Sequence, residues 1–257
     1  MADNRPKHVV VTGASSGIGE GIARAYAAKG CAVTIVARRQ ERLEALALEL
    51  GDNVHIAVAD LSNLDTCTAW IAPAEAALGP IDVLILNAGI QYVEPALEVD
   101  DARSDTLFAV NVHAPIRQAL TVAPAMVARG EGAIVIIASM SAIVHTPYMA
   151  HYSASKAAIA AYFETLRTEV EPAGVKVLTV YPGPVSTPME AAAKEQLGNP
   201  AMADKLPTGT PAGLARKIMK ALRKGKPRLI YPKAYEISRH LRVTSQWLTE
   251  RFSPKIR

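Results

Sequence analysis

The chain has 257 residues, and half of them are hydrophobic, which suits one large α/β domain with a sizeable core. Its two cysteines, Cys31 and Cys67, indicate reduced, buried thiols and exclude a disulfide-rich scaffold, and no apolar run approaches the roughly 20 residues that cross a bilayer. The net charge of +4 arises from residues 223–257, which hold ten Lys and Arg against two Glu, so we do not expect the protein as a whole to bind nucleic acid.

Short β-branched runs alternate with helical patterns along most of the chain. Strands are predicted at 8–12, 32–37, 54–59, 83–86, 133–138, 175–180 and 228–231. Helices are predicted from 17 to about 29 and at 40–50, 62–78, 99–129, 154–170 and 211–222. This alternation predicts right-handed βαβ units and therefore a single doubly wound Rossmann domain over 1–257, with a seven-stranded parallel sheet flanked by helices on both faces.

A glycine-rich turn follows the first predicted strand. Its residues, with the spacing G-x-x-x-G-x-G, are Gly13, Ser15, Ser16, Gly17, Ile18 and Gly19. Glycines let the backbone approach a pyrophosphate, and the N-terminus of the following helix offers free N–H groups and a positive dipole end. The turn therefore predicts a dinucleotide site, although the spacing differs from the usual G-x-G-x-x-G and a tight structural turn is the alternative.

The ends of the next strands supply further candidates for the same site. The second strand ends at Arg38 and Arg39, without the acidic residue that binds a ribose 2′-hydroxyl, and a guanidinium there suits the 2′-phosphate of NADP(H). The third strand ends at Asp60 and Leu61, which are placed to meet the adenine. The fourth strand closes on Asn87, Ala88 and Gly89.

The stretch after the fifth strand carries the candidate catalytic groups. Tyr152 and Lys156 are four residues apart and share one face of a helix. An ammonium group one turn away favours a phenolate and lowers the pKa of the tyrosine, which can then exchange a proton with a substrate oxygen. Ser139, at the carboxyl end of the strand, can hold that oxygen by a hydrogen bond. Tyr148 competes as the acid, but it has no lysine four residues on.

A proline-rich segment at 184–210 is interpreted as a flap over the substrate, with a short helix at 189–196. The predicted substrate pocket consists of Ser139, Ser141, Tyr148 and Met189. Most neighbouring residues are apolar, which favours an uncharged, hydrophobic carbonyl compound.

The chain ends in a basic extension at 232–257. Residues 234–252 form an amphipathic pattern in which Ile237, Leu241 and Leu248 share one face beside Trp247. We expect this face to pack on the protein, near the flap or a partner subunit. Peripheral contact with an anionic membrane is the alternative, because basic residues attract such a surface.

Six motifs occur together in one order: Thr12 to Gly19, Asn87 to Gly89, Asn111, Ser139, Tyr152 to Lys156, and Pro182 to Thr187. On these motifs the first 230 residues resemble the short-chain dehydrogenases/reductases, with Leu86 as one departure where many members have asparagine. The resemblance implies that Tyr152 is the acid/base, that Ser139 positions the carbonyl and that Lys156 lowers the tyrosine pKa and binds the nicotinamide ribose. It also implies that Asn111 holds a water that relays protons, and that the cofactor meets Pro182, Gly183, Val185 and Thr187.

These observations predict an NADPH-dependent reductase of ketones or aldehydes, or the reverse alcohol dehydrogenase. A cofactor-binding sensor or scaffold without turnover is the alternative, but it would have no need of the acid/base pair. The six histidines lack metal-ligand spacing, so we expect no metal site. We expect a homodimer or homotetramer, and the short polar N-terminus, which is unlike a signal peptide, predicts a cytoplasmic location.

Overall fold

In the computed structural model, residues 6–196 and 207–252 are described. Seven parallel strands form one sheet in the order β3-β2-β1-β4-β5-β6-β7. The strands are β1 (His8–Thr12), β2 (Ala32–Ala37), β3 (Val54–Val58), β4 (Val83–Leu86), β5 (Gly132–Ile137), β6 (Val175–Pro182) and β7 (Arg228–Tyr231). The predicted seven-stranded, doubly wound architecture is confirmed, and each predicted strand boundary lies within two residues of the observed one.

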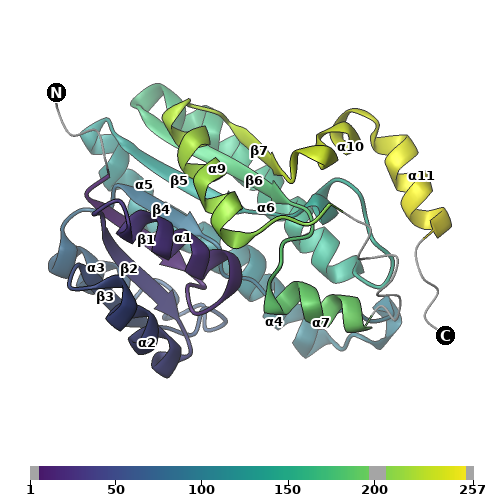
Figure 1. Ribbon diagram of the computed structural model, residues 1–257, viewed down its shortest axis with the longest axis horizontal. Coiled ribbons are helices and arrows are strands. Elements are labelled where there is room, and N and C mark those ends of the chain that lie inside the picture. The colour runs from purple at the N-terminus through teal and green to yellow at the C-terminus, as the bar shows by residue number, and fades with distance from the viewer. Residues whose placement is uncertain (1–5, 197–206, 253–257) are drawn as a thin grey trace.

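Helices cover both faces of the sheet because the strand residues alternate between two cores. Val9 and Val11 pack with α1 (Gly17–Ala27), α2 (Gln40–Leu50) and α9 (Pro211–Arg223). Val10, between them, packs toward α3 (Ile71–Leu78), α5 (Ala114–Arg129) and α6 (Ala150–Val170). Figure 1 views the molecule from the side of α1 and α9. The strand order reverses between β1 and β4, which is where such sheets open a crevice at their carboxyl ends.

The predicted helix at 62–78 is wrong in its first half, because only α3 (Ile71–Leu78) is helical. The Asp60 carboxylate accepts hydrogen bonds from the backbone N–H and the hydroxyl of Ser62. The Asn63 side chain accepts one from the N–H of Asp65. Such local bonds satisfy the backbone in a chain of turns and compete with the helix.

The predicted helix at 99–129 is interrupted by a π-helical turn around Asn111. It consists of α4 (Asp101–Phe108), a π-helical turn (Ala109–His113) and α5 (Ala114–Arg129). Asn111 lies in the π-helical turn, a distortion that is frequent at functional sites. The helix that carries Tyr152 and Lys156, α6, begins four residues before the predicted start.

The C-terminal extension is not the single amphipathic helix that the sequence predicts. A 3₁₀ turn (Lys233–Tyr235) leads into α10 (Glu236–His240), and α11 (Arg242–Phe252) follows after a break at Leu241. The expected packing of its apolar face is seen within the single chain only in part: Leu248 lines a cavity together with Met189 of the flap, whereas Ile237 and Leu241 are 62% and 51% exposed. Packing of these exposed residues on a partner subunit stays a prediction. The extension also meets the body of the protein through the Tyr235 ring at Gly183 and through polar contacts of Gln246 and Arg242 with His145.

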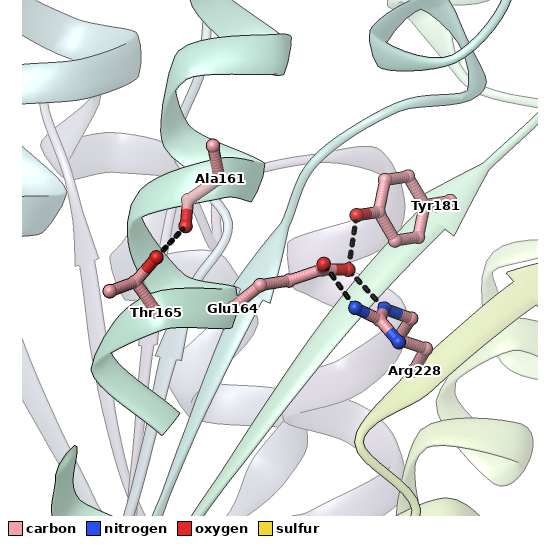
Figure 2. Close-up of polar contacts among 5 residues, drawn as sticks. All are labelled: Ala161, Glu164, Thr165, Tyr181 and Arg228. Carbon is pink, nitrogen blue, oxygen red and sulfur yellow. Dashed lines mark hydrogen bonds and ion pairs between the residues drawn. The ribbon is translucent and has the colours of Figure 1, made fainter. Parts of the chain in front are cut away.

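A polar cluster joins α6 to β6 and to β7, the strand that precedes this extension (Figure 2). Glu164 of α6 accepts a hydrogen bond of 2.7 Å from the Tyr181 hydroxyl of β6 and forms a two-pronged ion pair with Arg228 of β7. Bidentate pairing of this kind fixes geometry as well as adding stability. The last strand is thus held against α6, the helix that carries Tyr152 and Lys156.

Candidate active site

A cavity of about 860 Å³ lies at the carboxyl ends of the central strands. Most of the residues predicted from sequence line it: Gly13, Ser15, Ser16, Gly17, Ile18, Arg38, Arg39, Asp60, Leu61, Asn87, Ala88, Gly89, Ser139, Ser141, Tyr152, Lys156, Pro182, Gly183, Val185, Thr187 and Met189. Residues that are up to 176 positions apart in the chain thus meet in one crevice.

The glycine-rich turn is packed directly against the end of β4. Thr12 accepts hydrogen bonds at its hydroxyl from the N–H groups of Asn87 and Ala88, at 3.0 and 3.1 Å. The Asn87 amide donates back to the carbonyl of Thr12 at 2.9 Å. A Cβ added at Gly13 would lie 2.8 Å from the Cα of Ala88, so only glycine permits this approach.

Gly19 does not line the cavity. A Cβ on Gly19 would lie 2.3 Å from the carbonyl oxygen of Gly13, so this glycine lets α1 pack against the turn. Its contribution is to the position of the helix N-terminus rather than to direct contact with a ligand.

Two arginines follow β2 at the other end of the crevice. The Arg39 guanidinium donates hydrogen bonds to the hydroxyls of Ser15, at 2.8 and 3.2 Å, and of Ser16, at 2.9 Å. Burial, and then the nearby charges of Arg42 and Arg38, lower the pKa of Arg39, which marks a local concentration of positive charge. Asp60 lines the same end, where its pKa is lowered mainly by the hydrogen bond from the N–H of Ser62.

Tyr152 lines the cavity and is 9% exposed. Its phenol is hydrogen-bonded to the hydroxyl of Ser139, which also accepts a hydrogen bond of 3.1 Å from the N–H of Ser141. Ser139 is thereby oriented toward the same point in the cavity as the phenol. The pair presents two hydroxyl groups that can hold one substrate oxygen.

Lys156 lies one helical turn beyond Tyr152, with its ammonium nitrogen 5.7 Å from the centre of the phenol ring. The ammonium donates a hydrogen bond of 2.9 Å to the carbonyl of Ile137, at the end of β5. The position of Lys156 therefore depends on both α6, which carries it, and β5, which accepts its hydrogen bond. Its side chain borders the same cavity.

Asn111 lies behind this pair rather than on the cavity wall. Its amide donates to the carbonyl of Ile90 at 2.9 Å and to the hydroxyl of Ser155 at 3.0 Å, and its oxygen accepts from the N–H of Ile90 at 2.9 Å. A Cβ added at Gly89 would lie 3.2 Å from this oxygen and 3.3 Å from the Lys156 nitrogen, so both groups border the space over Gly89. Asn111 is therefore placed near Lys156, as the resemblance implies.

The expected lowering of the Tyr152 pKa by Lys156 is not what the protein shows. Burial raises the pKa of Tyr152 to about 12, and the hydrogen bond from Ser139 offsets only part of this rise. Burial likewise lowers the pKa of Lys156 to about 8. Desolvation disfavours the charged form of each group and outweighs the attraction between them. The neutral phenol is thus kept as a proton donor.

The flap contributes α7 (Pro188–Gln196), and residues 197–206 of the predicted flap lie outside the described part of the chain. The Thr187 hydroxyl accepts a hydrogen bond of 3.2 Å from the N–H of Glu190 at the start of α7. The Gln91 amide donates one of 3.1 Å to the carbonyl of Met189. These bonds hold the start of α7 beside the crevice.

Tyr148 does not line the cavity, contrary to its predicted place in the substrate pocket. It packs against a small cluster that includes Val93, Leu107 and Met149. Its backbone has a φ of +66°, which turns the chain into α6.

Residues that the sequence did not identify complete the substrate end. Glu190 comes from α7, and the C-terminal extension adds Tyr235, Ser238, Ser245, Leu248 and Thr249. The sequence placed the apolar face that includes Leu248 near the flap, but it did not single out the polar residues that reach the cavity beside it. Glu190 directly follows Met189, a predicted pocket residue, and this position could have indicated that Glu190 also lies at the pocket.

The cavity has the features that a nicotinamide dinucleotide requires. It offers a glycine cradle at a helix N-terminus, two guanidinium groups at one end and a buried lysine at the other. Among the residues that the structure describes, no group of three or more His, Cys, Asp or Glu side chains could hold a metal ion. In the same residues, no helix is both long and apolar enough to cross a membrane.

Comparison with known proteins gives a consistent result. Residues 7–198 match the family model described as short chain dehydrogenase. A galactitol 2-dehydrogenase (L-tagatose-forming) from Cereibacter sphaeroides is 41% identical over 189 residues, which cover 72% of this chain and 74% of that protein. A short chain dehydrogenase from Pseudocercospora fijiensis is 36% identical over 193 residues, or 72% of this chain but only 62% of that relative.

Solved structures share the fold over nearly the whole chain. A short-chain dehydrogenase from Streptomyces avermitilis is 32% identical with a TM-score of 0.83, and 97% of each chain is covered. A 3-ketoacyl-(acyl-carrier-protein) reductase from Brucella melitensis, complexed with NADH, is 27% identical with a TM-score of 0.79 over 87% of this chain and 95% of that one. A serine dehydrogenase complexed with NADP⁺ is 28% identical with a TM-score of 0.78 over 87% and 93%.

The family model covers about three quarters of the chain, and the residues matched include the glycine turn, Ser139, Tyr152 and Lys156. The chain therefore belongs to the short-chain dehydrogenase/reductase family of oxidoreductases, whose members bind nicotinamide cofactors.

Proposed function

We propose that the protein is an NADP(H)-dependent oxidoreductase that interconverts a ketone or aldehyde and the corresponding alcohol. The observation that carries this proposal is the buried arrangement of Ser139, Tyr152 and Lys156 on one wall of the cavity. A protein that only binds the cofactor has no need of a phenol held beside a serine hydroxyl.

In this proposal, the Ser139 hydroxyl and the Tyr152 phenol hold the substrate oxygen between them. The bound nicotinamide supplies or accepts the hydride. Tyr152 donates its proton to the oxygen of the reduced substrate, or takes one from an alcohol in the reverse direction. The Lys156 ammonium stabilises the negative charge that remains on the phenol oxygen, because opposite charges attract strongly in a site of low polarity. Asn111 orients the water that returns a proton toward Lys156.

The preference for NADP(H) is supported by the end of β2. Arg38 and Arg39 both line the cavity, and Ala37 precedes them where NAD-binding relatives of this fold place an acidic residue. Two guanidinium groups suit a 2′-phosphate, which carries up to two negative charges. Arg39 is already held by Ser15 and Ser16, while Arg38 is exposed.

A panel of ketones and aldehydes, assayed by the loss of NADPH absorbance, tests the activity directly. Tyr152→Phe keeps the ring and removes the proton, and we expect turnover to fall at least about a hundredfold. The affinity for NADPH, measured by fluorescence titration, should remain nearly unchanged. Tyr148→Phe is the matched control, because Tyr148 lies four residues earlier and outside the cavity lining.

Two results would contradict the proposal. An active Tyr152→Phe with an inactive Tyr148→Phe would show that the wrong tyrosine was assigned. Tight NADPH binding with no turnover of any carbonyl compound or alcohol would instead favour the sensor or scaffold. A homodimer or homotetramer and a cytoplasmic location remain expectations from sequence.

A further inference from the structure

A buried polar group at the substrate end of the cavity has no hydrogen-bond partner among residues 6–196 and 207–252: it is the Tyr235 hydroxyl. A buried hydroxyl without a partner costs free energy, so native proteins rarely keep one unless a ligand satisfies it. The half-buried Glu190 carboxylate, which comes from α7, lines the same cavity.

The Tyr235 ring is held firmly in place. A Cβ added at Gly183 would lie 3.0 Å from two of its ring carbons, so the ring lies directly on the backbone after β6. The ring also packs against the buried cluster of Ala138, Met140 and Tyr181. The 3₁₀ turn that carries Tyr235 follows β7, which the ion pair of Arg228 with Glu164 holds against α6 (Figure 2). Packing against the body of the domain therefore determines the position of the Tyr235 hydroxyl.

Glu190 faces the same space from the opposite segment of the chain. It lines the cavity together with Tyr152 and Tyr235. Its negative charge raises the pKa of both phenols, after burial as the main cause. Burial raises the pKa of Glu190 itself, while the positive charge of Lys194 opposes the rise.

The chemistry of the pair selects one kind of ligand group. A carboxylate accepts hydrogen bonds, and a phenol hydroxyl can donate one. A hydroxyl group satisfies both at once, because it donates its proton to the carboxylate and accepts at its oxygen. An ammonium group would satisfy only Glu190 and would meet the charge of Lys194 one turn further along α7.

We propose that Glu190 and Tyr235 form a second polar subsite that binds a hydroxyl group of the substrate, next to the carbonyl held by Ser139 and Tyr152. The substrate class is then a hydroxyketone and its diol rather than the plain hydrophobic carbonyl compound that the sequence favours. Met140, Met189 and Leu248 line the same end and leave room for an apolar body on such a molecule. This inference rests on the proposed carbonyl reductase activity and adds the recognition of a second group.

Matched ketones that differ by one hydroxyl test the subsite: acetoin against butanone, and benzoin against deoxybenzoin. We expect the wild-type protein to show a kcat/KM at least about tenfold higher for the hydroxylated member of each pair. Glu190→Leu removes the acceptor and should lower the ratio of kcat/KM for the hydroxylated ketone to kcat/KM for its partner by about 10- to 100-fold in each pair. Tyr235→Phe should lower the same ratio by about threefold to tenfold.

Glu195→Leu and Tyr162→Phe are the matched controls, since Glu195 is exposed on α7 and Tyr162 lies on α6 among apolar neighbours. Both should keep the wild-type preference. A wild-type protein that reduces both members of each pair equally well would overturn the subsite while leaving the reductase activity intact. Variants at Glu190 and Tyr235 that keep the preference would overturn it as well.

A binding measurement separates failure of the subsite from failure of the proposed function. Ligand-detected NMR on the protein loaded with NADP⁺ compares hydrobenzoin with the analogue that lacks one hydroxyl. If no ketone is reduced but hydrobenzoin binds more tightly, and Glu190→Leu removes that difference, the subsite stands and the reductase proposal fails. Equal binding of the two compounds overturns the subsite whatever the activity.

Discussion

Two walls of the cavity differ in how firmly their residues are held: the catalytic wall, with Tyr152, Lys156 and Asn111 behind them, and the C-terminal wall, which α10 and α11 contribute. Asn111, Lys156 and Tyr152 are 1%, 5% and 9% exposed, and Asn111 and Lys156 are bonded to the backbone of neighbouring segments. In α11, by contrast, Val243 and Trp247 are 84% and 58% exposed, and its polar contacts with the body of the protein include those of Gln246 and Arg242 with His145. Figure 1 shows α10 and α11 standing beside the domain rather than against its sheet.

This difference indicates a division of tasks. Hydride and proton transfer require atoms held within fractions of an ångström, which a packed sheet and helix provide. Substrate recognition at the outer wall tolerates more variation, and a lightly attached segment can vary without disturbing the catalytic geometry. Mutations on the first wall should therefore act on turnover, and those on the second on substrate affinity.

The largest effect should follow from Lys156→Met, which keeps the length of the side chain and removes its charge. We expect turnover to fall about a hundredfold or more, because the phenol oxygen of Tyr152 then has no cation to stabilise its charge. Lys217→Met, on the exposed face of α9, is the control and should retain full activity. Steady-state kinetics at saturating cofactor measure both, and a Lys156→Met protein with near-normal turnover would contradict the assigned role.

The same substitution should change how stability depends on pH. Because burial lowers the pKa of Lys156 from 10.5 to about 8, the unfolded state binds more protons than the folded state between these values. The free energy of unfolding should therefore rise with pH from about 8, until the buried Tyr152 opposes the trend above about pH 10. Denaturant unfolding across this range should show the rise in the wild type and a flatter dependence in Lys156→Met.

The next largest effect concerns the cofactor end of the catalytic wall. Arg38→Ala removes an exposed guanidinium whose charge acts on the neighbouring Asp60 and Arg39. A hydrogen bond to a charged group contributes about 1.5–3 kcal/mol, so NADPH should bind roughly 10- to 150-fold more weakly, while NADH affinity hardly changes. Arg39→Ala also releases Ser15 and Ser16, and it should weaken both cofactors. Equal losses of NADPH and NADH affinity in Arg38→Ala would refute the 2′-phosphate assignment.

A smaller effect should follow from detaching the C-terminal wall. The Gln246 carboxamide accepts a hydrogen bond of 2.7 Å from the N–H of His145 and donates one of 3.2 Å to its carbonyl. In Gln246→Ala we expect amide hydrogen exchange in α11 to accelerate by about threefold to tenfold and KM to rise by about twofold to fivefold, with turnover and the global melting temperature nearly unchanged. Gln40→Ala, on exposed α2, is the control. A large loss of turnover or of global stability would show that α11 belongs to the rigid part of the molecule.

The smallest effect should come from His8 at the start of β1, and it concerns the stability of the sheet rather than activity. This fully buried side chain hydrogen-bonds the carbonyl of Gly79 at 2.7 Å and the hydroxyl of Thr34 at 2.8 Å, and burial lowers its pKa below 6.5. Protonation favours the unfolded state, so stability should begin to fall as the pH decreases through 6.5. His8→Leu should be less stable at neutral pH, by about 1–3 kcal/mol because Thr34 and Gly79 lose their partner, and less sensitive to acid. If His8→Leu loses stability in acid as steeply as the wild type, other groups cause the acid sensitivity.

Much of the catalytic wall could be predicted because its signals are local. The glycine turn, the buried strands and the spacing of Tyr152 and Lys156 each lie within a few residues, where backbone geometry alone determines which groups meet. The errors arose where competing local bonds or burial decided the outcome. The turns after Asp60 replaced half of a predicted helix, and the desolvation of Tyr152 reversed the expected direction of its pKa.

The sequence by itself determined the parallel sheet and the glycine-rich turn at its crevice, and it identified the candidate acid/base residues, since alternating apolar patterns and short motifs indicate these without knowledge of distant neighbours. Only the tertiary structure placed Glu190 and Tyr235 at one end of the cavity, although they are 45 positions apart in the chain. The physical reason is that burial and electrostatic environment depend on contacts between segments that the chain brings together only on folding.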